Sequence, residues 1–409
     1  GTTMVTKRLL VFVSLILAIL FHFLFYFNYY GPSIGSLKGV HQYFLAIGSA
    51  IIMVFLYFTT YWRADLKRSN LSMLFDILIL WFFISLIRSI LEIRDLSGFI
   101  SFIFNNYLAL TCFPLLFFIV GINPNYFHMT NRILFIYVVL AFLFSLPFIN
   151  FFELQLYLAY PLFFIILTIP LRRSADKILI LIISITVIVV SLTNRAGIIR
   201  ILFSFCIVAA YFIMQKVHIN KKLLYTLVFI VLMIPLVSLY LGLKGQSIFQ
   251  MILGDDDTPY SQLNPYADTR TFLYYEVFQD LKTNDVLLFG KGLNAGYDSP
   301  SFQTYRREVV EVGFLQILMK TGIVGFILYF SVLIVGIFKS IGHSNNLFLK
   351  ALGFLLIGYI IMFFIENQLA YNLLNISIWL VVGMCYSPVL RGLNDKEIGV
   401  LFHKSNKNH

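Results

Sequence analysis

The sequence predicts an all-α protein that crosses a membrane many times. Of its 409 residues, 60% are hydrophobic and only 12% are charged, whereas soluble domains are about half apolar and about one quarter charged. The mean hydropathy is +0.88. Apolar runs of about 20 residues, which is the length of a helix that spans a bilayer, recur along the chain. We therefore expect a single polytopic membrane domain over residues 1–409.

Twelve apolar runs are predicted to span the membrane. They lie at 9–27, 42–61, 73–91, 99–120, 132–149, 155–171, 177–193, 197–215, 223–241, 312–338, 347–366 and 371–389. The sixth and seventh are short, so either is also a candidate re-entrant segment. Helices one to nine then occupy 9–241 and helices ten to twelve occupy 312–389. A large polar loop, 242–311, separates them, and 390–409 form a tail.

The positions of Lys and Arg predict the orientation, because cytoplasmic loops are enriched in these residues. Most cations fall on one side: Lys7, Arg8, Arg63, Lys67, Arg68, Arg132, Arg172, Arg173, Lys177, Lys216, Lys221, Lys222, Lys339, Lys350, Arg391, Lys396, Lys404 and Lys407. We assign that side, with both termini, to the cytoplasm. The net charge of +11 is then explained by these loops and by anionic lipid headgroups, and no nucleic-acid partner is expected.

Two outer loops carry cations against this trend. The short loop 193–197 holds Arg195, and Arg200 lies one turn deeper in the next helix. The long loop 242–311 holds the others: Lys244, Arg270, Lys282, Lys291, Arg306 and Arg307. Ionisable groups at membrane depth commonly serve function, so these residues are candidates for binding an anion. For Arg200, a structural pair with a neighbouring helix is an equally good interpretation.

Within the long loop, the pattern predicts an amphipathic helix over 269–282. Asp268 is placed to cap it, because its carboxylate accepts the free N–H groups of the first turn. The i+4 spacing of its apolar residues gives a stripe: Leu273, Val277 and Leu281. We expect this helix to lie flat at the membrane interface. Arg270 and Tyr274 are one turn apart on it, so both can face the same way.

The glycine pair around Lys291 predicts a tight turn. Successive N–H groups of Gly290-Lys291-Gly292 are able to form a concavity that binds an anion; a turn with no further role is the alternative. The apolar run 286–289 before it is expected to turn back toward the membrane. A nucleotide-binding loop is excluded, because no βαβ unit surrounds these glycines and no Lys-Ser/Thr follows them.

No metal or cofactor is expected. Asp255, Asp256 and Asp257 contain an Asp-x-Asp spacing that suits Mg²⁺, but a solvated acidic loop tip explains them better. The seven histidines are scattered without metal-ligand spacing, and no Ser or Cys lies in a nucleophile motif.

The most specific motif lies at the start of the tenth predicted helix. Residues 306–325 read RREVVEVGFLQILMKTGIVG, in which Glu311 is followed by Leu315 and Gly322. This spacing resembles the signature of the O-antigen ligase and Wzy-type O-antigen polymerase superfamily. The turn at Arg195 resembles the short outer loop of that superfamily, and Arg270 with the helix and Gly-x-Gly turn after it resembles the start of its large outer loop. In the ligases of this superfamily, the residue that resembles Glu311 in position is a His. The Glu in this sequence therefore favours a polymerase.

The resemblance implies a GT-C-like membrane glycosyltransferase of the bacterial inner membrane, with its active site on the periplasmic face. It implies transfer of a growing glycan from undecaprenyl diphosphate onto a sugar hydroxyl of a repeat unit held by the same carrier. The expected partners are these two lipid-linked glycans, the bilayer and a chain-length-regulating membrane protein. Neither a metal nor another cofactor is implied.

The chemistry of this transfer assigns roles to the candidate residues. Diphosphate leaves as an anion, and the planar fork of Arg grips its oxygens, so Arg195 and Arg270 are expected to stabilise it. Glu311 is the first candidate for the general base and Glu308 the second. The remaining candidates are expected to bind substrate: Arg200, Arg306, Arg307, Lys291, Gly290, Gly292, Tyr274 and Tyr297. For each Tyr, anchoring at the interface is the alternative.

Other functions are compatible with the sequence. An O-antigen ligase and a protein O-oligosaccharyltransferase are alternatives within the same enzyme class. A flippase or transporter of lipid-linked glycans would distribute charges through several helices, whereas the charges here gather in outer loops. A non-catalytic scaffold would tolerate replacement of Arg195 and Arg270.

Overall fold

The computed structural model describes residues 2–30, 72–93, 96, 99, 107–148, 156–190, 195–217, 220–243, 271–299, 304–370 and 372–403. The second predicted span, the first part of the fourth, the acidic triplet and Arg270 lie outside these ranges.

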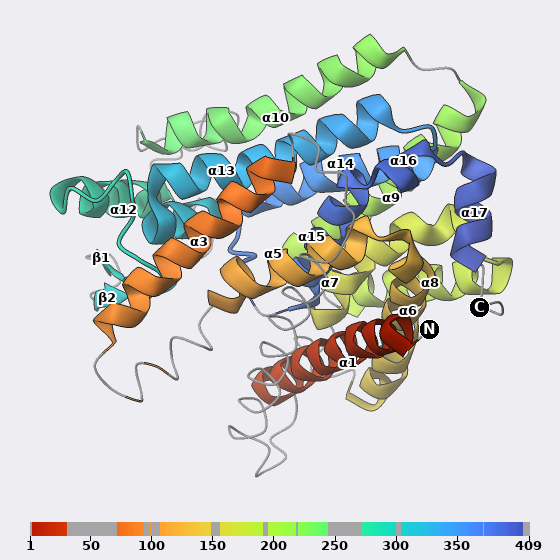
Figure 1. The fold of residues 1–409 in the computed structure, drawn as a ribbon, viewed down its shortest axis with the longest axis horizontal. Helices are drawn as coiled ribbons and strands as arrows, with labels where there is room; N and C mark the ends of the chain where they lie inside the picture. Colours follow the sequence, from red (N-terminus) through yellow and green to blue (C-terminus); the bar gives the residue numbers. More distant parts are fainter. Residues whose placement is uncertain are drawn as a thin grey trace.

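Long helices form the bulk of the molecule (Figure 1). They are α1 (Thr2–Tyr30), α3 (Ser72–Glu92), α5 (Tyr107–Ile122), α6 (Phe127–Ser145), α7 (Leu156–Ile165), α8 (Ser174–Val190), α9 (Arg195–Lys216), α10 (Lys221–Leu243), α13 (Gly313–His343), α14 (Leu347–Phe363) and α15 (Leu373–Tyr386). Each coincides with one predicted span. The sixth span is interrupted, because α7 passes into the 3-10 helix Ile166–Leu171.

Five of the described helical stretches are long and apolar enough to cross a membrane. They are Thr6–Tyr26, Met73–Leu91, Pro124–Phe148, Ala196–Lys216 and Gly313–His343. Shorter apolar helices occupy five further predicted spans. The chain is therefore a mostly helical membrane protein, and the total of twelve spans stays a prediction.

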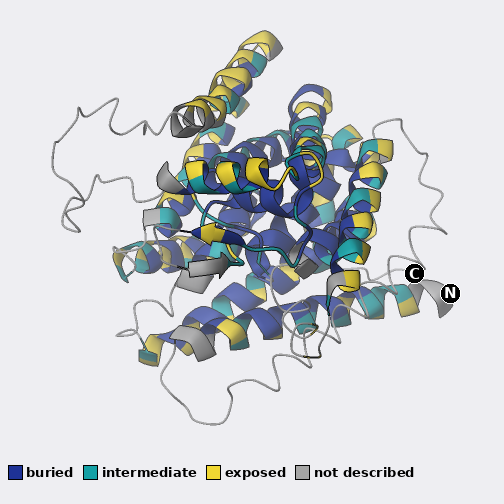
Figure 2. Cartoon of the chain, turned by 90° about the vertical axis from the view of Figure 1, so that its left-hand side faces the viewer, coloured by how far each residue is buried: buried dark blue, intermediate teal, exposed yellow. Residues whose placement is uncertain are grey.

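The core is centred on α15, in which every residue is buried. This helix packs closely on α5 through glycines: a Cβ on Gly121 would lie 2.1 Å from the Leu380 carbonyl oxygen, and one on Gly383 would lie 2.2 Å from that of Phe118. Small residues allow such close backbone approach between membrane helices. Figure 2 shows buried residues gathered at the centre of the bundle and exposed ones on the outward faces of the peripheral helices.

One end of the bundle, which we call the hairpin end, carries the described part of the long loop. It consists of α12 (Thr271–Thr283), β1 (Tyr297–Ser299) and β2 (Thr304–Arg307), and the start of α1 lies at the opposite end (Figure 1). The helix predicted over 269–282 is confirmed as α12. Its apolar stripe is buried against protein, and the expected position of the helix, flat at the membrane interface, stays a prediction. The strands pair antiparallel, with Tyr297 opposite Arg307, and add a small hairpin that an all-α prediction lacks.

The predicted tail is helical as far as His403. It forms α16 (Pro388–Gly392) and α17 (Asp395–His403). Ile398 and Phe402 of α17 are buried, and the Phe402 carbonyl oxygen lies 2.6 Å from Nδ1 of His128. The Arg172 guanidinium lies over the Phe402 ring, 5.1 Å from its centroid. The C-terminal segment is thus docked on α6 and on the turn before α8.

Candidate functional site

The loop after α12 is joined to a break in α13. Helical geometry stops at Gly322, whose φ is 70°. The loop backbone supplies the hydrogen bonds that the break leaves open: Lys291 N to Met319 O at 2.9 Å, Gly292 N to Lys320 O at 3.1 Å, and Ile323 N to Leu287 O at 3.0 Å. A Cβ on Gly322 would lie 2.2 Å from the Leu288 oxygen, so only glycine permits this contact. We call loop residues 287–292 with the break at Gly322 the backbone splice.

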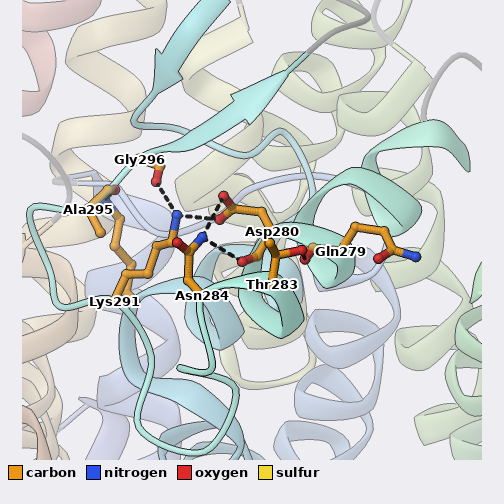
Figure 3. A network of polar contacts seen from close by, with 8 residues as sticks. Gln279, Asp280, Thr283, Asn284, Lys291, Ala295 and Gly296 are labelled. Atoms are coloured by element: carbon orange, nitrogen blue, oxygen red, sulfur yellow. Dashed lines mark hydrogen bonds and ion pairs between the residues drawn. The ribbon is translucent and has the colours of Figure 1, made fainter.

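The splice engages the backbone amides of the glycine turn. The amides of Lys291 and Gly292 donate to α13, and that of Gly290 donates to the Val286 carbonyl at 2.7 Å. The Lys291 ammonium lies 2.5 Å from an Asp280 carboxylate oxygen and 3.3 Å from the Gly296 carbonyl oxygen. Figure 3 shows this network. In this structure the turn holds the loop to the bundle, and its amides are already occupied by protein groups.

Helix α3 braces the same splice with residues that sequence reasoning missed. The Arg88 guanidinium donates to the carbonyls of Phe289 and Gly290 at 3.2 and 3.3 Å. Leu293 N donates to Ser89 Oγ at 2.6 Å. The available signal was Arg88 itself, a cation at the hairpin end of the third predicted span. Its role here is to bind backbone oxygens.

The mouth of α13 brings a candidate cation and a candidate base together. Arg307 ends β2, and its Nη2 donates to Glu311 Oε1 at 2.7 Å. The two side chains are 22% and 41% exposed. The residues between them are fixed by the buried Gln316, whose Oε1 accepts from Val310 N at 2.7 Å and whose Nε2 lies 3.4 Å from the Glu308 carbonyl oxygen. Glu308 and Glu311 thus lie on one short segment, whose backbone is fixed by hydrogen bonds to Gln316.

Tyr297, on β1, lies opposite Arg307 of this ion pair in the strand pairing. Its side chain is fully buried, and burial raises its pKa, while the neighbouring Arg307 acts in the opposite direction. Two residues along the strand, Ser299 Oγ donates to Glu276 Oε2 of α12 at 2.6 Å. The predicted sugar-binding Tyr297 is therefore part of the floor of the hairpin. Glu276 is a further carboxylate of this end that sequence reasoning did not select.

The other candidate tyrosine, Tyr274, also faces inward. Its hydroxyl donates to the Phe364 carbonyl at 3.3 Å, and its ring centroid lies 5.3 Å from that of Phe314. This contact ties α12 to α13 and to the turn after α14. It accounts for the burial of Tyr274.

Arg200 forms an ion pair with a residue from another part of the bundle. A structural pair of this kind was one of the two roles that we considered for Arg200 from the sequence. Its side chain is 2% exposed and pairs with Glu366, in the turn after α14. The guanidinium also lies 4.9 Å from the centroid of the Tyr160 ring. Sequence reasoning missed Glu366, because a lone acidic residue beside a short connection carries no pattern.

The remaining candidates are placed only in part. Arg195 is the first residue of α9, and Arg306 lies in β2; the side chains of both, and the whole of Arg270, lie outside what the structure describes. Within the described ranges, no group of three or more His, Cys, Asp and Glu is arranged to hold a metal ion.

Comparison with known families identifies part of the chain. Residues 178–330 match the family described as O-antigen ligase. The match runs from α8 into α13 and contains every candidate site residue predicted from the sequence. The predicted resemblance to the O-antigen ligase and polymerase superfamily is thereby confirmed over this segment. No curated protein and no solved structure matches the chain.

Proposed function

We propose that this protein is a surface-polysaccharide polymerase. It transfers a growing glycan from undecaprenyl diphosphate onto a sugar hydroxyl of a second repeat unit on the same carrier. The observation that carries the proposal is the Arg307–Glu311 pair at the mouth of α13, inside the segment that matches the O-antigen ligase family. The reaction needs a cation for the leaving diphosphate beside a carboxylate for the attacking hydroxyl.

The step balances without another reactant. The acceptor oxygen attacks the anomeric carbon of the donor glycan, and the bond from that carbon to the phosphate oxygen breaks. The bonding pair leaves with undecaprenyl diphosphate, and the hydroxyl proton passes to Glu311, or to Glu308 as the second candidate. Arg195, Arg270 and Arg307 stabilise the charge that develops on the diphosphate, because cations held in place lower the energy of a negative charge that forms in the transition state.

The proposed reaction implies the partners of the protein and its location in the cell. The two substrates are lipid-linked glycans of the bacterial inner membrane, and the hairpin end is the periplasmic face. Both termini are cytoplasmic. A chain-length-regulating membrane protein is the expected protein partner.

A ligase is the second candidate, because the matching family is described by that activity. It would use the same donor with a different acceptor. The Glu at position 311 favours the polymerase over the ligase, in which a His is expected there. Chain length separates the two, since only a polymerase lengthens the glycan on its carrier.

Complementation of a bacterial strain that lacks its own polymerase tests the proposal. The intact chain should restore long glycans. At equal membrane abundance, Arg195→Ala, Arg270→Ala and Glu311→Gln should each leave single repeat units. Glu397→Gln, the same chemical change on α17 at the opposite end, is the control and should behave as the intact chain. Normal chain lengths from all three site variants would overturn the assignment.

A further inference from the structure

The turn between α14 and α15 contacts α9, α12 and α13, three helices that begin at or shortly after a candidate catalytic residue. Glu366 pairs with Arg200 of α9, the helix that begins at Arg195. The Phe364 carbonyl accepts the Tyr274 hydroxyl of α12, the helix that directly follows Arg270. The Phe364 ring stacks on Phe314 of α13 at 4.4 Å. This turn, residues 364–366, lies outside the segment that matches the family model.

Glu366 makes the most direct of these connections. Its carbonyl oxygen accepts the amide of Gly313 at 3.1 Å, and Gly313 is the first residue of α13, two positions after Glu311. A Cβ on Gly313 would lie 2.9 Å from the Phe363 ring and 3.0 Å from the Glu366 oxygen. The main chain of Glu366 is thus in close contact with the mouth of α13, while its carboxylate holds α9.

We propose that Glu366 is a positioning residue for the transfer reaction: it fixes the start of α9, with Arg195, to the mouth of α13, with Glu311. The inference rests on the proposed function and deepens it. Arg195 and Glu311 must both reach the reacting groups around one anomeric carbon, so their separation has to be held within a fraction of an ångström. Arg200 then serves as the contact through which Glu366 acts on α9.

The burial of the pair suits this role. With Arg200 2% exposed and Glu366 20% exposed, solvent and salt have little access to their interaction. Removing one partner leaves the other charge buried without compensation. The two helices are therefore expected to separate or shift when the pair is broken, whereas a pair in water would be replaced by solvent.

Kinetics of the purified full-length enzyme in lipid nanodiscs, with a lipid-linked repeat unit as substrate, tests the inference. In Glu366→Gln, which keeps the size and loses the charge, kcat should fall on the order of 100-fold with little change in KM. Glu366→Asp, which keeps the charge, should recover most of the loss. Unchanged kcat in Glu366→Gln, or a loss that follows only the unfolded fraction, would overturn the inference.

A distance measurement tests the same contact without using activity. Spin labels replace Ile199 on α9 and Val309 before α13, which are 46% and 39% exposed, after Cys112, Cys206 and Cys385 are changed to Ser. The parent should give one narrow distance and Glu366→Gln a broadened or shifted one. Asp280→Asn, which breaks the Lys291–Asp280 pair instead, is the matched control and should leave the distance unchanged. A parent-like distribution in Glu366→Gln contradicts the proposal.

The two readouts separate the failure of this inference from the failure of the proposed function. If the wild-type enzyme makes polymer and Glu366→Gln matches it in rate and in distance, the positioning role is wrong and the polymerase assignment stands. If the wild-type enzyme makes no polymer, the proposed reaction is wrong, and the positioning role for it falls as well, whatever the distances show.

Discussion

Among the residues that the structure describes, two Arg–Glu pairs at the hairpin end differ in their surroundings. Arg307 and Glu311 are four residues apart, with side chains 22% and 41% exposed. Arg200 and Glu366 come from different parts of the bundle and are 2% and 20% exposed. Water screens the first pair, so that its charges can exchange partners at little cost. The second pair is desolvated, and each charge depends on the other. The same chemical pair thus suits substrate binding in one place and fixation of helices in the other.

The two pairs also differ in how they relate to the family match. The exposed pair lies entirely within residues 178–330, whereas Glu366 lies beyond them. The match therefore covers the residues that are proposed to do chemistry. Of the Arg200–Glu366 contact that is proposed to hold them in place, it covers only Arg200. A description of the site from the matched segment alone would omit the turn at 364–366, which contacts α9, α12 and α13.

The largest expected effect contrasts the pairs directly. Glu366→Ala should lower the free energy of unfolding by about 3 kcal/mol, because it leaves Arg200 buried without its counter-charge. Glu311→Ala should lower it by less than about 1 kcal/mol, as is usual for an exposed pair. Denaturant unfolding in detergent micelles, followed by tryptophan fluorescence, measures both. Equal losses in the two variants would mean that burial does not distinguish the pairs.

A smaller effect is expected from a buried contact without charge. Gly322→Ala places a side chain at positive φ and against the Leu288 carbonyl, so it should cost about 1–3 kcal/mol. Gly399→Ala is the control: nothing lies within 4 Å of a Cβ there, and alanine favours the helix. The same unfolding measurement applies. A neutral Gly322→Ala would mean that the backbone splice is not needed to hold the mouth of α13.

The smallest effect concerns pH at Tyr297, the buried neighbour of Arg307 in the exposed pair. Burial raises the folded-state pKa of Tyr297, so the neutral phenol is favoured in the folded hairpin. Its contribution to stability is full below the ordinary tyrosine pKa of about 10 and is lost as pH rises through the higher folded value. As pH rises above about 10, wild-type protein should lose more stability than Tyr297→Phe. An identical pH dependence in the two proteins would show that this phenol does not titrate with unfolding.

Hydropathy was sufficient to predict the long helices of the bundle, because a membrane helix depends on a local run of apolar residues; the tail helices α16 and α17 were not predicted. α9 and α13 were located in this way, and the apolar stripe at i+4 located α12. The strands β1 and β2 were not predicted, since Tyr297–Ser299 and Thr304–Arg307 are too short for an alternating pattern to develop.

The candidate site was predicted in its local part only. Arg307 and Glu311 are neighbours in sequence, and their proximity follows from that. The partner of Arg200 was out of reach, because pairing across helices depends on packing that no sequence pattern encodes. The glycine turn was recognised as a turn, but its partner is a break inside an apolar span. In the sequence, Gly322 does not differ from other glycines of membrane helices. Its role is seen only from its contact with the loop in the structure.

The break at Gly322 also determines how the site meets the lipid. Every residue from Gly313 to Gly322 is buried by protein, whereas Ile327, just beyond the break, is 56% exposed. The segment that follows Glu311 is thus shielded from the acyl chains by its neighbours. Helices that face lipid tilt or shift when bilayer thickness changes; this segment is surrounded by protein instead. We therefore expect the depth of Glu311 to be fixed by the protein and to stay constant in membranes of different thickness.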